Sequence, residues 1–263
     1  MVPKAEDAEM KTGRRTSSIF SILALAASAT AQSFEIASVR VSQPQQREYR
    51  FDTPASGVTA FRVPLGVLIR WAYGFHLSQK FWIDGPSWQE PGADVVRYDV
   101  VAKPSMPSAP EQLRAMMRGL LAERWGVSAH FETRVIPAYV LSVDKAESKL
   151  RLSENEGDGV PTRSASNLAF SGATIWQMIE EIGLQCAAPV VDETALAGHY
   201  DFTIEDFMVY GNDYSIPIPG TRGADFCPAW DQSLRKVGLR LKLEKRPIKL
   251  LIVDHAEKSP TAN

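Results

Sequence analysis

Two Tyr-Asp pairs contain side chains that could take part in catalysis. Tyr98 and Asp99 lie in RYDVVAK, and Tyr200 and Asp201 lie in HYDFTIE, each ahead of an alternating run. The repetition indicates either a duplicated active-site element or a duplicated piece of scaffold. Because only Tyr-Asp recurs, without a repeated nucleophile or metal ligand, the pattern favours scaffold. We expect each Tyr to lie on the buried face of a strand and each Asp to point outward, toward a turn amide.

Other catalytic motifs are absent from the sequence. Neither G-x-S-x-G nor G-x-x-x-x-G-K-[ST] occurs, and the four histidines are too dispersed for a metal-binding spacing such as H-E-x-x-H. His199 and Asp201 could hydrogen bond on one strand face, but no nucleophile completes a triad. The string ENEGDG resembles a calcium loop, yet the twelfth position counted from Glu154 is Ala165 instead of a carboxylate. We predict no catalytic residue, no metal site and no cofactor, which favours a non-enzymatic protein.

Six aromatic residues fall within the 18 positions from Trp71 to Trp88. Large rigid rings can bind sugars, peptides or lipids, but they also build cores. We expect most of these rings to be core, with Trp82 and Trp88 as the exposed exceptions. The candidate ligand-binding residues are therefore Trp82, Trp88, Tyr98 and Tyr200.

The segment MKTGRRTSSIFSILALAASATAQS has the layout of a secretory signal peptide. Basic residues precede the apolar run 19–27, and Ala29-Thr30-Ala31 forms an A-x-A cleavage site. We expect residues 1–31 to be the signal peptide, cleaved near Ala31, with Met10 as a candidate for the true start. The mature chain is then periplasmic or secreted. It contains no transmembrane segment, because no later stretch approaches about 18 apolar residues.

Export would place Cys186 and Cys227 in an oxidising compartment, where they could form a disulfide that closes a loop of about 40 residues. Two separate buried thiols are the alternative. Residues 1–31 hold four basic and three acidic residues of a chain whose net charge is -2, so the mature chain carries a formal charge of -3. A chain with this charge lacks the excess of basic residues that nucleic-acid binding requires, so no nucleic-acid partner is expected.

The elements predicted from the hydrophobic pattern occur twice in one order: helix, strand, strand, helix, strand, strand. Aligning Tyr98 with Tyr200 and Gly126 with Gly238 also superposes two later pairs of residues, which are Glu132 with Glu244 and Arg134 with Arg246. An internal repeat of this length is a duplicated domain.

We therefore predict an α+β fold with two tandem duplicated modules, 32–148 and 167–263, joined by the linker 149–166. Each module is expected to be a small sheet covered on one face by two helices. The last two strands of each module are expected to form a hairpin, with one turn near Ile136-Pro137 and the other between LRLKLEK and IKLLIVDH.

Seven blocks of the sequence, from FEIASVR at 34–40 to GLRLKLEKRPIKLLIVDHAEKSP at 238–260, resemble in order the Solibacter-type, soil-associated family of uncharacterised exported bacterial proteins. The terminal VDHAEKP-like ending of that family reads VDHAEKSP here, with Ser259 before the proline. The resemblance implies an exported protein built on a domain of unknown function. The segments PVVD and GHYDFTI more weakly resemble the short N-terminal domain of secretins and TonB-dependent receptors, which implies docking of periplasmic partners. The long loop 207–226 departs from that compact domain.

Two functions are consistent with these features. The first is a non-enzymatic extracytoplasmic module that binds an envelope protein or polymer, for which exposed sheet edges provide a surface. The alternative is a protein that binds or degrades carbohydrate in a Trp-rich cleft between the modules.

Overall fold

The computed structural model describes residues 33–43, 49–86, 95–144, 149–157, 160–164, 167–205 and 227–262. All of these belong to the compact unit Ala31–Asn263. The predicted signal peptide, the candidate residue Trp88 and the loop 207–226 lie outside the described residues.

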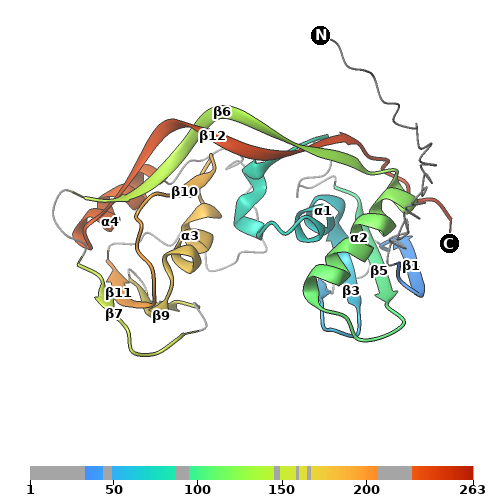
Figure 1. Cartoon of the computed structure of the whole chain (residues 1–263), viewed down its shortest axis with the longest axis horizontal. Helices are drawn as coiled ribbons and strands as arrows, with labels where there is room; N and C mark the ends of the chain where they lie inside the picture. Colours follow the sequence, from blue (N-terminus) through green and yellow to red (C-terminus); the bar gives the residue numbers. More distant parts are fainter. Residues whose placement is uncertain are drawn as a thin grey trace, which may run out of the picture. The chain divides into compact units, whose positions relative to one another are not determined.

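The first sheet contains β1 (Ile36–Val41), β2 (Arg50–Asp52), β3 (Val58–Pro64) and β5 (Arg97–Lys103), in the antiparallel order β1-β5-β3-β2. Alternate residues of β5 are buried on one face, where they pack with α1 (Leu65–Ala72) and α2 (Pro110–Trp125) in one core. Figure 1 shows both helices beside this sheet. The helix α2 ends at Gly126, whose φ of 59° suits a left-handed C-terminal residue.

A second sheet contains β7 (Arg151–Leu152), β8 (Thr162–Arg163), β9 (Leu168–Ala173) and β11 (Tyr200–Ile204), in the order β7-β11-β9-β8. Its core includes the buried residues of α3 (Ile175–Gly183) and α4 (Cys227–Lys236). The hydroxyl of Thr174 accepts the N–H of Gln177 at 3.2 Å, which caps the start of α3.

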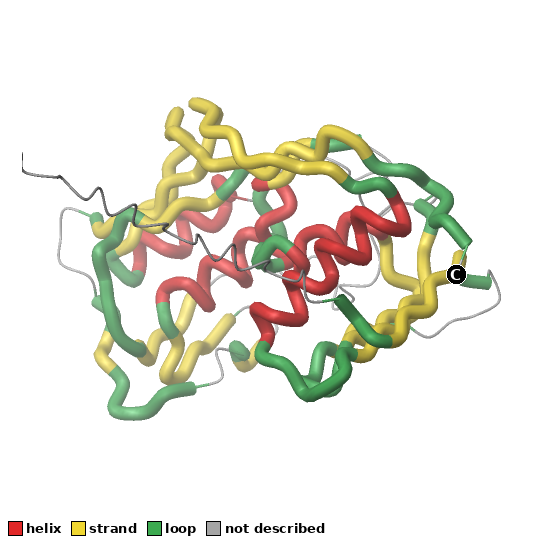
Figure 2. Tube along the Cα trace, turned by 45° about the vertical axis from the view of Figure 1, so that its right-hand side comes forward, coloured by secondary structure: helices red, strands yellow, loops and turns green. Residues whose placement is uncertain are grey.

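The third sheet has the order β10-β6-β12-β4 and is dominated by two long strands, β6 (Ser128–Val143) and β12 (Leu239–His255). These strands pair antiparallel along their whole length, while the short strands β4 (Ile83–Asp84) and β10 (Val190–Asp192) pair parallel at the two edges. Figure 2 shows the long strands, in yellow, running past both groups of helices.

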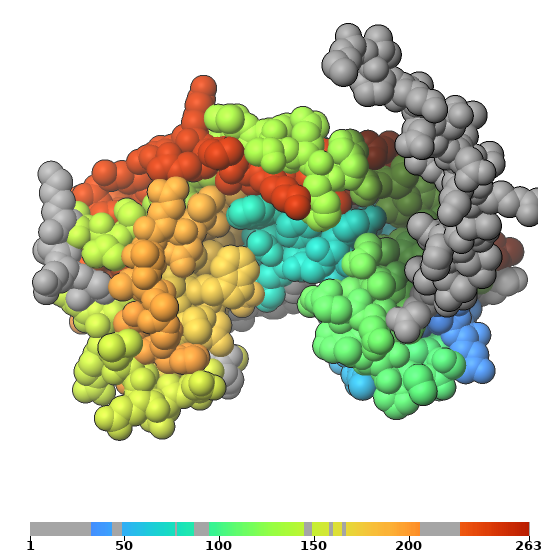
Figure 3. All heavy atoms as spheres, viewed as in Figure 1, coloured from blue at the N-terminus to red at the C-terminus, as the bar shows by residue number. Residues whose placement is uncertain are grey.

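Each long strand contributes side chains to the core formed mainly by the other half of the sequence. Tyr139 and Leu141 near the end of β6 pack in the core of α3 and α4. Leu251 and Val253 near the end of β12 pack in the core of α1 and α2. The 3-10 helix η1 (Leu77–Trp82) lies against both α3 and β12, as the teal, yellow and red atoms of Figure 3 show. Each core is therefore completed by a strand from the other half of the sequence.

The two predicted hairpins are wrong, because each pair of runs forms one continuous strand. Pro137 pairs with Lys245 and Pro247 pairs with Val135, within the uninterrupted ladder of β6 and β12. Each proline precedes the segment that pairs with an edge strand, so it has a neighbouring strand on one side only. A proline is tolerated at such a position because its missing N–H removes no bond to a second neighbour.

The described residues contain four α-helices and three four-stranded sheets, which confirms a mixed α+β fold.

Candidate functional site

The two predicted tyrosines occupy separate cores. Tyr98 is fully buried, its ring packs edge-on against Trp125 at 5.2 Å, and its hydroxyl donates to the carbonyl of Lys258. Burial raises the pKa of Tyr98. Tyr200 is also buried, and its hydroxyl donates to the carbonyl of Ala197 at 2.9 Å. Both hydroxyls are thus already bonded to the backbone.

The aspartates that follow these tyrosines each hold a bulge in the neighbouring strand. Asp99 Oδ1 accepts the N–H of Arg62 at 3.1 Å, and Asp201 Oδ1 accepts the N–H of Gly172 at 2.8 Å. Arg62 has φ 55° and Gly172 has φ 59°, and both lie within register shifts of their strand pairs. The repeated Tyr-Asp therefore combines a core ring with a carboxylate that fixes a bulge.

Asp99 lies deeper than expected, since only 3% of it is exposed. Its carboxylate also accepts the hydroxyl of Ser42 at 2.6 Å and Nε of Arg40 at 3.1 Å. Burial alone would raise the pKa of Asp99, but the hydrogen bonds from Ser42, Arg62 and Arg40 outweigh it and lower the pKa. The pKa of Asp201 is lowered chiefly by the hydrogen bond from the Gly172 amide.

A second repeated feature is an arginine bound to carboxylates, which links an edge strand to the long strands. Arg134 binds both oxygens of Glu132 at 2.9 Å and Asp84 of β4 at 2.7 Å. These hydrogen bonds raise the pKa of Arg134 and lower that of Glu132. The sequence alignment paired these residues with their counterparts but assigned them no role.

The counterpart on β12 is Arg246, whose guanidinium contacts two carboxylates. It binds Glu193, just after β10, at 2.7 and 3.1 Å, and Glu244 at 2.8 Å. The bond to Arg246 lowers the pKa of Glu193. The forked geometry of a guanidinium group suits a carboxylate. Arg134 and Arg246 each already bind carboxylates of this chain.

Of the two tryptophans predicted to be exposed, Trp88 lies outside the described residues. Trp82 is half-buried and packs against the cluster of Ala138, Ile248 and Leu250. Phe131 is 47% exposed and lies 6.3 Å from the rings of both Tyr73 and Phe75, with Lys249 Nζ 4.6 Å from the Phe131 centroid. The sequence argument missed Phe131, although its place in the alternating run HFET could have marked it as a surface residue.

No metal-binding group of three or more His, Cys, Asp or Glu side chains occurs among the described residues. The closest constellation pairs His130 Nδ1 with Asp254 at 2.9 Å, and His130 Nε2 lies 4.0 Å from Glu132. Both His130 and Asp254 are exposed strand residues.

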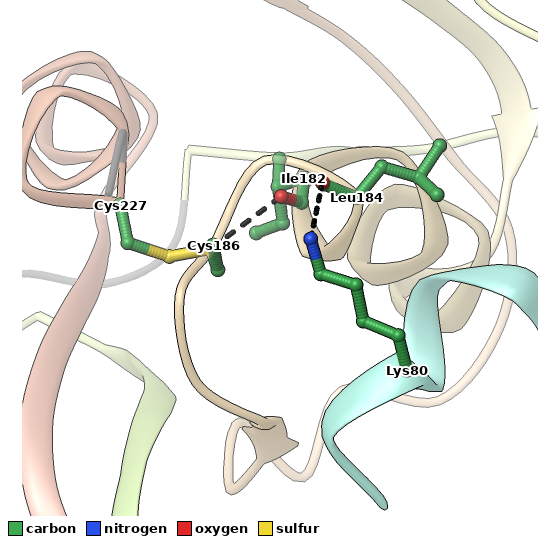
Figure 4. Close-up of a disulfide and its surroundings, with 5 residues drawn as sticks. All are labelled: Lys80, Ile182, Leu184, Cys186 and Cys227. Carbon is green, nitrogen blue, oxygen red and sulfur yellow. Dashed lines mark hydrogen bonds between the residues drawn. A yellow bond between two sulfur atoms is a disulfide. The ribbon is translucent and has the colours of Figure 1, made fainter. Parts of the chain in front are cut away.

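Cys186 and Cys227 form a disulfide, as one of the two sequence interpretations predicted. Figure 4 shows that it joins the segment after α3 to the first residue of α4. Both cysteines are buried, and the chain-entropy model assigns such a loop a stabilisation of about 4 kcal/mol. Nearby, Lys80 of η1 donates to the carbonyl of Leu184 at 3.5 Å.

The C-terminal segment closes the end of α2. The N–H of Glu257 donates to the carbonyl of Trp125, and the N–H of Thr261 donates to that of Arg124, both at 2.8 Å. The last carbonyls of a helix lack partners within the helix, so these bonds act as a cap supplied from the far end of the chain. The C-terminal segment that includes VDHAEKSP thus has a structural role.

These features define a disulfide-containing α+β protein whose two cores share a pair of long strands. The chain belongs to the family described as "Protein of unknown function (DUF3738)", which matches residues 66–256. No curated protein and no solved structure matches the chain. Within the described ranges, no helix has both the length and the apolar character needed to cross a bilayer.

Proposed function

We propose that this chain is an exported, non-enzymatic module that binds an extended segment of a cell-envelope protein along the edge strand β1. The observation that carries the proposal is the position of β1 at the edge of the first sheet, where, among the described residues, it pairs with β5 alone. Ile36 is 59% exposed and Val41 is 49% exposed at the two ends of this strand. An edge strand with apolar side chains is a template for strand addition.

The hydrogen-bonding register turns the N–H of Val41 toward this edge. The N–H of Ser42 donates to the carbonyl of Arg97 at 2.9 Å, directly after β1. In an antiparallel ladder, alternate residues face the partner strand, so the N–H group of Val41 points away from β5. An incoming strand would bond to the backbone here, beginning at the N–H of Val41, and would take its specificity from exposed side chains such as Ile36 and Val41.

Export is supported by the N-terminal sequence and by the disulfide. The charged segment, short apolar run and A-x-A site predict cleavage near Ala31, which would place the mature N-terminus shortly before β1. Disulfides persist in oxidising compartments. The Solibacter-type resemblance implies an exported protein, and the weaker resemblance to the secretin and TonB module implies a docking role.

We also propose that the two halves arose by duplication of a module, with boundaries at 32–148 and 167–263 and the linker 149–166 between them. The alignment that superposes Arg134 on Arg246 also superposes Val135 on Pro247. Val135 pairs directly with Pro247, and Arg134 and Arg246 lie symmetrically on either side of this pair. Such a register is expected if a two-fold axis relates the two copies at this point.

A proline on the open edge tests the proposed function. Val41→Pro would remove an outward N–H from an edge position that tolerates proline, while Val41→Thr keeps that donor and the β-branched shape. We expect crosslinking pull-downs from envelope fractions to recover one specific protein with the wild type and with Val41→Thr. Recovery should fall by about tenfold with Val41→Pro.

Equal recovery with both variants, or no specific protein with the wild type, would count against the proposal. The carbohydrate alternative is favoured by the exposed ring of Phe131 beside Tyr73 and Phe75. Specific glycan-array binding that Val41→Pro leaves intact would support that alternative, in which Trp82 and Trp88 remain candidate contacts.

A further inference from the structure

Arg62 carries a long side chain in a backbone conformation that favours glycine. Its φ is 55°, and the corresponding bulge in the second sheet is occupied by Gly172 with φ 59°. Glycine is required at 172 because a Cβ there would lie 2.4 Å from the backbone nitrogen of Gly157. At 62 the strand accommodates a side chain, at the cost of an unfavourable φ. Strain of this kind raises the question of what the arginine side chain does there.

A second arginine and a tyrosine lie beside it. Arg97 Nη1 donates to the carbonyl of Arg62 at 3.2 Å. Val63, which follows Arg62, pairs with Tyr98, which follows Arg97, so the two arginines lie on neighbouring strands close to each other. Burial and, next, the charge of Arg62 lower the pKa of Arg97. Arg50, which follows Tyr49, pairs with Phe61, which precedes Arg62, so Tyr49 lies beside Arg62 at the start of β2. Partial burial raises the pKa of Tyr49, and the charges of Arg70 and Arg97 oppose this rise.

Neither of these two arginines has an acidic partner in the described part of the chain. Arg40 pairs with Asp99, and Arg50 pairs with Asp52, but no carboxylate of the described residues lies within ion-pair distance of Arg62 or Arg97. The carboxylate of Asp99 accepts the backbone N–H of Arg62, not its guanidinium. Two adjacent positive charges without a counter-charge destabilise each other unless an anion joins them.

We propose that Arg62 and Arg97, with the hydroxyl of Tyr49 as a further donor, form a binding site for an oxyanion group, either a carboxylate or a phosphate. Guanidinium groups match such groups because they donate two parallel hydrogen bonds. The site lies on the β2, β3 and β5 side of the first sheet and does not use the open edge of β1. It therefore extends the proposed function without depending on it.

The test compares polymers that differ in their anionic group. The mature full-length chain is titrated calorimetrically with polygalacturonate, with polyphosphate and with neutral dextran of similar length. We expect binding to at least one anionic polymer and none to dextran. Arg62→Gly and Arg97→Gln should each weaken that binding by about tenfold or more, because each removes one guanidinium.

Two controls separate the site from general electrostatics and from misfolding. Lys242→Ala removes an exposed positive charge on β12 and should change the affinity by less than about twofold. Arg62→Gly should melt at or above the wild-type temperature, because glycine suits the φ at this position. The preferred polymer distinguishes a carboxylate ligand from a phosphate ligand.

The inference is overturned if the wild type binds neither anionic polymer, if dextran binds equally, or if Lys242→Ala weakens binding as much as Arg62→Gly. It fails separately from the proposed function. A chain that captures an envelope protein through β1 but binds no anion would retain only the first proposal, and Val41→Pro should leave anion binding unchanged.

Discussion

The ionised form of Asp99 is part of the folded structure, because one carboxylate holds three donors. Its pKa is lowered in the folded state, so it stabilises the fold above its unfolded pKa of about 3.9, and this contribution is lost as the pH falls through the lower folded pKa. We expect Asp99→Asn to reduce the free energy of unfolding near neutral pH by about 2 kcal/mol. The variant should also lose less stability than the wild type on acidification below about pH 4. Urea unfolding at a series of pH values measures both effects.

Asp52→Asn is the matched control, because Asp52 lies on the same sheet but is only half-buried and, among the described residues, pairs with Arg50. It should change the free energy of unfolding by less than about 0.5 kcal/mol at neutral pH. If the two variants have the same stability and the same pH profile, the proposed role of Asp99 in holding the bulge is wrong.

Residue types in the sequence predicted only part of these roles. The recurrence of Tyr-Asp without a nucleophile favoured scaffold, and alternation placed Tyr98 and Tyr200 on buried faces. The amide that each Asp binds depends on a bulge in another strand, and a bulge is set by pairing rather than by local pattern. Arg62 gave no signal at all, because nothing in its type indicates a positive φ. The disulfide followed from the expected compartment and the presence of two cysteines.

The long strands explain why the predicted elements were mostly right and their pairing was wrong. The helices and several strands were predicted from apolar spacing, which reflects local contacts. The strand β3 was not predicted, and β7 and β8 lie within the segment 149–166 that was predicted to be a linker. The runs on either side of Pro137 and Pro247 were divided by turn chemistry, although neither contains the Asn-Gly or Asp-Gly that a tight hairpin favours. Continuity there depends on the partner strand, which lies about a hundred residues away in sequence and has no local signal.

Leu251 tests whether β12 belongs to the first core. It is fully buried beside residues of α1 and α2, whereas Leu243 on the same strand is 55% exposed. We expect Leu251→Ala to lower the free energy of unfolding by about 3 kcal/mol, through lost transfer energy and a cavity. Leu243→Ala should cost less than about 0.5 kcal/mol. Chemical denaturation of both variants measures the difference, and equal losses would show that β12 does not complete that core.

At the scale of the whole molecule, the fold class could be predicted, but the way the halves interlock could not. Composition and periodicity indicate small sheets with two helices each, and the structure contains two such groups. The third sheet takes one long strand and one short edge strand from each half. The module boundaries predicted from the sequence therefore do not coincide with the boundaries of the two cores, because each core includes side chains from the other side of the predicted linker.

This interlocking predicts that neither half folds alone. A fragment of residues 32–148 lacks Leu251 and Val253 of its core and the strand that pairs with β4, while a fragment of 149–263 lacks Tyr139 and Leu141. We expect each isolated fragment to show no cooperative thermal transition by near-ultraviolet circular dichroism. A matched control carries a protease site between residues 148 and 149 in the full chain. After cleavage, its halves should remain associated through β6 and β12 and melt cooperatively. A cooperative transition in either fragment alone would show that the modules are independent, with the exchanged strands contributing little to their stability.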